Sequence, residues 1–116
     1  MITIYGIASC DSCRSARRWF EQADRAAEFH DLRVDGCDRA LLQRWVGAVG
    51  WEALLNRRSI TWRKIPEVDR MGLTEAKAIR LMLDYPTLIR RPVIEQPGRV
   101  VVGVDEDAWR EFKAAS

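Results

Sequence analysis

Residues 2–13 read ITIYGIASCDSC, and this stretch decides the fold. Its apolar start predicts a short β-strand over residues 2–5, and a turn follows. Residues 11–23 predict a helix, since their apolar side chains recur at helical spacing. The motif Cys-x-x-Cys, with Cys10 and Cys13, therefore lies between a strand and the first turn of a helix. That placement is typical of redox-active thiols.

Three further strands are expected along the chain. Residues 27–32 alternate as a second strand would. Residues 93–95 and 99–102 are rich in β-branched side chains and flank the turn sequence Gln-Pro-Gly at residues 96–98. This arrangement predicts a β-hairpin.

Helices are expected where a residue suited to capping precedes an apolar stripe. Asp38, Thr74 and Asp105 are such residues. The stripes that follow them are Leu41, Leu42, Trp45, Val46 and Val49; then Ala76, Ile79, Met82 and Leu83; then Ala108, Trp109 and Phe112. The glycines Gly47 and Gly50 are expected to end the first of these helices. Residues 51–55 predict another helical turn, whereas residues 56–68 show no clear pattern.

The resulting order is β-α-β, a helical stretch, then β-β-α. This is the order of a thioredoxin-like fold with a helical insertion. An α/β architecture, with a four-stranded mixed β-sheet flanked by helices, would bury every stripe. The 116 residues fit a single domain, 1–116, that is large enough to need neither disulfides nor a metal.

The charge, the hydropathy pattern and the cysteine count limit which functions are expected. The 19 basic and 17 acidic residues leave a net charge of +2, which gives no reason to expect direct binding of nucleic acid or of a membrane. No signal peptide is visible, and no apolar run approaches the roughly 20 residues of a membrane span. We therefore expect a cytoplasmic protein whose three cysteines are reactive or metal-binding thiols rather than structural disulfides.

Cys10 is the expected nucleophile. A thiol at a helix N-terminus faces unpaired N–H groups and the positive end of the helix dipole, which favour the thiolate. Arg14, Arg17 and Arg18 add positive charge. Cys13 lies one turn on and is expected to resolve the adduct formed on Cys10, or alternatively to be a small buried hydrophobe. Cys37 is either incidental or an alternative resolving thiol.

A zinc site is the competing interpretation of the same residues. Cys10, Cys13, Cys37 and His30 together would make a Cys₃His ligand set. An α/β core of this size folds without metal, so we expect no metal and a structural or surface role for His30.

Several motifs together resemble the arsenate reductase (ArsC)/Spx/YffB family. They are residues 2–5 with the loop to Cys10, Leu-Leu-Asn-Arg-Arg at residues 54–58, and Leu-Ile-Arg-Arg-Pro-Val at residues 88–93. Residues 5–7 and 55–59 look most similar to the YffB-type branch. The resemblance covers nearly the whole chain, and it implies a thioredoxin-like core in which Cys10 is the redox-active cysteine.

The resemblance also implies an anion site. In arsenate reductases of this type the cysteine attacks arsenate, arginines hold the oxyanion, and glutathione with glutaredoxin resolves the adduct. Arg91 matches the arginine of the family's Arg-Pro motif, and Pro92 matches its proline, which is typically cis. Arg58 matches a second arginine, with Arg57 as the alternative under a shifted alignment. Guanidinium groups bind carboxylates and oxyanions through paired hydrogen bonds.

Two positions depart from the arsenate reductases. A third anion-binding arginine is replaced by Gly103, which weakens the case for arsenate as substrate. Cys13 is extra, and it makes the chain similar to the Cys-x-x-Cys members, including Spx. We therefore expect a thiol-dependent oxidoreductase that holds no bound cofactor and draws electrons from glutathione or a glutaredoxin- or thioredoxin-type donor. The alternative is a non-enzymatic redox sensor in which a Cys10–Cys13 disulfide changes affinity for a protein partner such as RNA polymerase.

Overall fold

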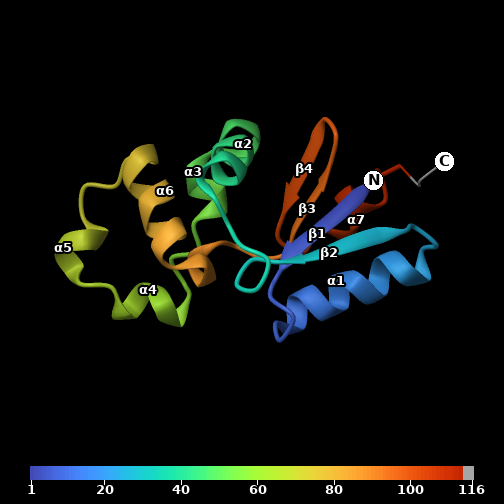
Figure 1. Cartoon of the computed structure of the whole chain (residues 1–116), viewed down its shortest axis with the longest axis horizontal. Helices are drawn as coiled ribbons and strands as arrows, with labels where there is room; N and C mark the ends of the chain where they lie inside the picture. The colour runs from blue at the N-terminus through green and yellow to red at the C-terminus, as the bar shows by residue number, and fades with distance from the viewer. Residues whose placement is uncertain (114–116) are drawn as a thin grey trace. The chain divides into compact units, whose positions relative to one another are not determined.

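A computed structural model describes residues 1–113 of the chain (Figure 1). The chain divides into two compact units. The first, here the sheet unit, contains Met1–Gly36 and the chain from Arg91 onward; the second, here the helical unit, is Cys37–Arg90. The single-domain organisation expected from the sequence stays a prediction.

The sheet unit holds four strands in the order β2-β1-β3-β4. Their bounds are β1 Ile2–Gly6, β2 Ala27–Asp31, β3 Val93–Gln96 and β4 Arg99–Val102. Strands β1 and β2 run parallel, while β1 with β3 and β3 with β4 are antiparallel. The predicted mixed sheet and hairpin are thus confirmed.

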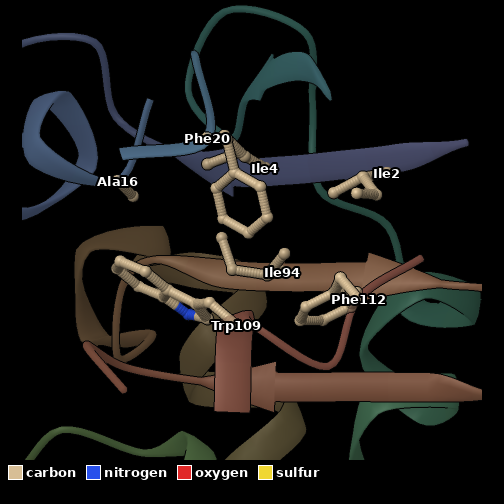
Figure 2. Close-up of a cluster of buried hydrophobic side chains, with 7 residues drawn as sticks. All are labelled: Ile2, Ile4, Ala16, Phe20, Ile94, Trp109 and Phe112. Atoms are coloured by element: carbon tan, nitrogen blue, oxygen red, sulfur yellow. The ribbon is translucent and has the colours of Figure 1, made fainter. Parts of the chain in front are cut away.

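One face of the sheet carries the core of this unit. Ile4 and Ile94 lie opposite each other on β1 and β3, and both are buried. They pack against Phe20 of α1 (Asp11–Gln22) and Trp109 of α7 (Glu106–Trp109), as Figure 2 shows. The rings of Phe20 and Trp109 lie 5.6 Å apart, so α1 and α7 cover the same face of the sheet.

Asp105 caps α7, as predicted, by accepting a hydrogen bond from the N–H of Ala108. The sequence places Phe112 on this helix, but in the structure it lies after the end of α7, and it still packs into the core. The last helix is therefore shorter than its apolar stripe.

The helical unit contains five α-helices and one 3₁₀ turn within its described residues. They are α2 Arg39–Val49, α3 Trp51–Leu54, α4 Ile60–Lys64, α5 Glu67–Arg70, α6 Glu75–Asp84 and η1 Pro86–Leu88. Asp38 caps α2 and Thr74 caps α6, each through a side-chain oxygen that accepts a backbone N–H. Both caps are as predicted.

Two sequence expectations for this unit need correction. Gly47 lies inside α2, which ends only before Gly50. On α6 the buried face includes Ala78 and Leu81, whereas Ala76 is exposed. A stripe read at 3.6-residue spacing fixes the face only to within about one position, which explains the shift. None of the described helices has the length and apolar character needed to cross a membrane.

Candidate thiol site

Cys10 is the N-cap residue of α1, in the sheet unit. Strand β1 ends at Gly6, and the chain then turns so that the N–H of Cys10 donates to the carbonyl of Ile7 (2.9 Å). The carbonyl of Cys10 accepts the first intrahelical bond, from the N–H of Arg14 (3.0 Å). No side-chain oxygen caps this helix. The half-buried Cys10 sulfur therefore lies where the unpaired N–H groups of the first turn point.

The surroundings of Cys10 favour its thiolate. Partial burial of the sulfur opposes ionisation. Hydrogen bonds from the N–H and the thiol of Cys13, the charge of Arg91 and the N–H of Ser12 outweigh it, and the net effect lowers the pKa of Cys10 below its ordinary 9.0. The helix N-terminus thus has the electrostatic effect predicted from the sequence, and the guanidinium that contributes belongs to Arg91.

Cys13 has the opposite environment. Its side chain is fully buried, and its sulfur accepts a long hydrogen bond from the N–H of Ile7 (3.5 Å). Burial raises the pKa of Cys13 to about 11, and the neighbouring Cys10 adds to the increase. The two thiols influence each other's pKa, yet Cys13 is also the buried small side chain that the sequence allows as an alternative.

Gly6 makes room for Cys13. A Cβ atom built on Gly6 would lie 2.3 Å from Sγ and 3.1 Å from Cβ of Cys13. Real Cβ atoms do not approach a sulfur so closely, so only glycine fits at the end of this strand while Cys13 lies behind it.

Arg91 and Pro92 adjoin the thiol site in the same unit. The peptide bond between them is cis, as the resemblance implies, and Pro92 is buried. Nε and Nη1 of Arg91 are buried and have no hydrogen-bond partner among the described residues. A guanidinium in this state has donors available for an anion. Gly103 donates its N–H to the carbonyl of Pro92 (2.8 Å) and has a φ of +83°, a backbone conformation that an arginine rarely adopts.

The remaining predicted site residues belong to the helical unit. Arg58 has an exposed side chain, and its backbone N–H donates to Oδ1 of Asn56 (3.0 Å). The guanidinium of Arg57, the alternative, lies over the ring of Trp51 at 5.6 Å. Burial and the charge of Asp38 raise the pKa of Cys37 to about 11. A role for Arg58 in anion binding, and for Cys37 as a resolving thiol, stays a prediction.

Metal ligands are the competing interpretation of these thiols. Within residues 1–113 no group of three or more His, Cys, Asp or Glu side chains is arranged to hold a metal ion. Nε2 of His30 makes a hydrogen bond with the carbonyl of Gly36 (2.7 Å), and its ring lies 4.9 Å from that of Tyr5. These contacts are structural, as expected for His30.

One side chain near the thiol site is missed by the sequence analysis. The carboxylate of Asp31, at the end of β2, accepts the N–H of Ala8 in the loop that leads to Cys10 (2.9 Å). Asp31 precedes a loop and shows no motif, so the only available signal is its place at a strand end.

The fold and the site together define a class of protein. A mixed sheet in the order β2-β1-β3-β4, a cysteine at the start of the helix after β1 and a cis-proline before β3 are the features of a thioredoxin-like protein with a helical insertion. Comparison with known proteins then gives the particular group. The sequence profile of the ArsC family matches residues 5–112, and the chain belongs to this family.

Three relatives illustrate the range of the family. A structure named YffB protein is 44% identical, with a TM-score of 0.91, over 95% of this chain and 96% of that one. An arsenate reductase (ArsC) related protein from Brucella melitensis is 40% identical, with a TM-score of 0.77, over 96% and 92% of the two chains. The global transcriptional regulator Spx of Streptococcus mutans is 31% identical over 97% of this chain and 82% of its own length.

Proposed function

We propose that the protein is a thiol-dependent oxidoreductase whose nucleophile is the Cys10 thiolate. Its substrate is a disulfide, such as a mixed disulfide of glutathione, or a small oxyanion. The observation that carries the proposal is the position of Cys10 at an otherwise uncapped helix N-terminus, near Arg91, whose buried Nε and Nη1 have no hydrogen-bond partner among residues 1–113. Membership of the ArsC family supports it.

The proposed reaction with a disulfide proceeds by two exchanges. The Cys10 thiolate attacks one sulfur of the substrate, forms a mixed disulfide and releases the other sulfur as a thiolate. The Cys13 thiol then gives its proton to the thiolate already released, attacks the Cys10 sulfur and releases the second substrate sulfur as a thiolate. The substrate has gained two electrons, which the two cysteines lost in forming the Cys10–Cys13 disulfide. Glutathione or a glutaredoxin- or thioredoxin-type donor restores both thiols.

Arg91 has two proposed roles in this reaction. Its positive charge favours the Cys10 thiolate, and its unpartnered Nε and Nη1 can donate to a carboxylate of glutathione or to an oxyanion. Arg58 is proposed as a further anion-binding residue on the strength of the family resemblance alone. Gly103 offers no side chain for a third, which favours a disulfide over arsenate as substrate.

The test is thiol-dependent turnover of a glutathione mixed disulfide, with arsenate assayed in parallel. We expect C10S to abolish turnover and C37S, the matched control, to retain it. C13S is expected to accumulate a mixed disulfide on Cys10 that is visible by mass spectrometry. Turnover that survives in C10S would exclude the proposal, and the absence of a trapped species in C13S would limit Cys13 to packing.

A second candidate function is a redox sensor without turnover. The similarity to Spx regulators over 97% of the chain and the presence of Cys-x-x-Cys support it. A pull-down with oxidised and with reduced protein separates the two candidates. Capture of a protein partner that depends on the Cys10–Cys13 disulfide, with no turnover of either substrate, favours the sensor.

A further inference from the structure

Asp31 is a buried charged side chain next to the thiol site. It is 7% exposed, and it is the only polar or charged side chain in the buried class among residues 1–113. Its carboxylate accepts three backbone N–H groups. Oδ2 accepts that of Ala8 (2.9 Å), while Oδ1 accepts those of Arg33 (2.8 Å) and Val34 (3.1 Å). A buried carboxylate satisfied in this way is fixed in place.

These hydrogen bonds join two separate turns. Asp31 ends β2 and lies opposite Gly6, which ends the parallel strand β1. Arg33 and Val34 belong to the turn after β2, whereas Ala8 belongs to the turn after β1. One carboxylate therefore attaches the turn that leads to Cys10 to the neighbouring strand.

Ala8 is the point of attachment because of its place in the turn. The N–H of Cys10 donates to the carbonyl of Ile7, so Ala8 is the second residue of a four-residue turn. Only Ser9 separates Ala8 from Cys10. The unpaired N–H groups of the first turn of α1 face the Cys10 side chain only if this turn keeps its place at the start of the helix.

Asp31 is suited to this contact at neutral pH. The N–H of Ala8 above all, helped by those of Arg33 and Val34, holds the pKa of Asp31 below its ordinary value, although burial opposes this. The side chain is then ionised, and both oxygens act only as acceptors.

We propose that Asp31 is a positioning residue of the thiol site: it fixes the turn of residues 7–10 and thereby holds the Cys10 sulfur on the N–H groups of α1. The inference rests on the proposed function, because it concerns the reactivity of the same thiolate. Asp31 touches neither substrate nor sulfur and acts through Ala8.

The direction in which the pKa of Cys10 changes when Asp31 is replaced distinguishes a positioning role from an effect of the Asp31 charge. As a charge alone, the Asp31 carboxylate repels the Cys10 thiolate, so its neutralisation would lower the pKa of Cys10. As a positioning group, it keeps the sulfur on its N–H donors, so its loss raises the pKa of Cys10. A purely structural role would lower stability and leave that pKa unchanged.

The test is the pH dependence of Cys10 alkylation by iodoacetamide, counted at Cys10 by mass spectrometry, in wild type and D31N. An asparagine has one acceptor oxygen, so it cannot accept the N–H of Ala8 and also those of Arg33 and Val34. We expect the midpoint to rise by about one pH unit, the scale of a helix N-terminal interaction. The control is D35N. Among residues 1–113 the Asp35 carboxylate accepts only the N–H of Asp31 (2.8 Å), and it is exposed, so the D35N midpoint stays at the wild-type value.

A second variant covers the case in which D31N does not fold. A8P removes the N–H donor, and proline suits the second position of a turn, yet its Cδ would meet the Asp31 oxygen and displace the turn. We expect the midpoint of Cys10 alkylation to rise by about one pH unit in A8P as well. A midpoint that is unchanged or lower in both folded variants overturns the inference. A wild-type midpoint near 9 would instead count against the proposed function itself.

Discussion

The two ends of the Cys-x-x-Cys motif lie in opposite environments. Cys10 is the N-cap residue of a helix and is half-buried. Partial burial opposes its ionisation, but N–H groups and Arg91 stabilise the thiolate and lower the pKa of Cys10. Cys13 is fully buried against Gly6, and burial raises its pKa to about 11. A single helical turn therefore separates a thiol suited to attack from a thiol that stays protonated at neutral pH.

This difference indicates an order of events. In the proposed reaction, the sulfur that ionises readily attacks the substrate first, and the buried sulfur reacts only afterwards, with the neighbouring Cys10. The two cysteines of the motif are therefore not equivalent in the structure. The helix N-terminus lowers the pKa of Cys10, whereas burial against strand β1 raises the pKa of Cys13.

The largest expected effect comes from filling the space behind Cys13. In G6A the new Cβ would overlap Sγ of Cys13 and press on its Cβ, and both are held by the surrounding core. We expect the free energy of unfolding, measured by urea denaturation, to fall by about 1–3 kcal/mol, the usual cost of overpacking.

Two controls show whether this loss comes from Cys13. The double variant G6A/C13A lacks the overlapping sulfur and should lose less than the sum of the single variants. In G47A the new Cβ meets nothing within 4 Å inside α2, so this variant should gain about 0.5–1 kcal/mol. A G6A protein as stable as wild type would contradict the tight packing of Cys13.

The raised pKa of Cys13 predicts a loss of stability at alkaline pH. The folded state keeps the thiol protonated up to about pH 11, whereas the unfolded chain ionises near 9.0. The contribution of Cys13 is therefore complete below pH 9 and declines as the pH rises toward 11. Urea unfolding of wild type and C13A between pH 8 and 10.5 should show a weaker decline in C13A.

Cys37 must be removed to isolate that effect, because burial and the charge of Asp38 raise its pKa to about 11 as well. The difference between C37S and the double variant C13A/C37S then reports Cys13 together with its effect on the neighbouring Cys10, without a contribution from Cys37. Equal pH dependence of these two proteins would show that Cys13 ionises in the folded protein as readily as in the unfolded chain.

Local signals predict much of the fold. The caps at Asp38, Thr74 and Asp105 and the hairpin turn at Pro97 and Gly98 are predictable because the groups involved are within a few residues of each other. The short helices α4 and α5 are not, since helices of four or five residues depend on packing rather than on their own propensity.

The residues of the thiol site likewise fall into those that the sequence predicts and those that it does not. Cys10 is predictable from its place between a strand and a helix, and Arg91 and Pro92 from the family resemblance. Asp31 is not, because its partner Ala8 is 23 residues away and meets it only once β1 and β2 pair. The sequence alone leaves the burial of Cys13 open, although a glycine at the end of a strand is a sign of close approach.

Arg91 provides a smaller test of the contrast between the two cysteines. In R91M the positive charge near Cys10 is lost while much of the side-chain volume remains. We expect the midpoint of Cys10 alkylation to rise by about one pH unit, the lower end of the effect of a nearby opposite charge. An unchanged midpoint would assign the low pKa of Cys10 to the helix N-terminus alone.

The smallest expected effect concerns Arg14, which the sequence suggests as a source of positive charge for Cys10. Its guanidinium instead pairs with Asp11, and both side chains are largely exposed. Exposed pairs of this kind contribute about 0–1 kcal/mol and are screened by salt. R14Q should therefore leave the Cys10 midpoint within error of wild type and change the free energy of unfolding by less than about 0.5 kcal/mol. A shift in R14Q as large as that in R91M would mean that the arginines of α1, rather than Arg91 alone, set the reactivity of Cys10.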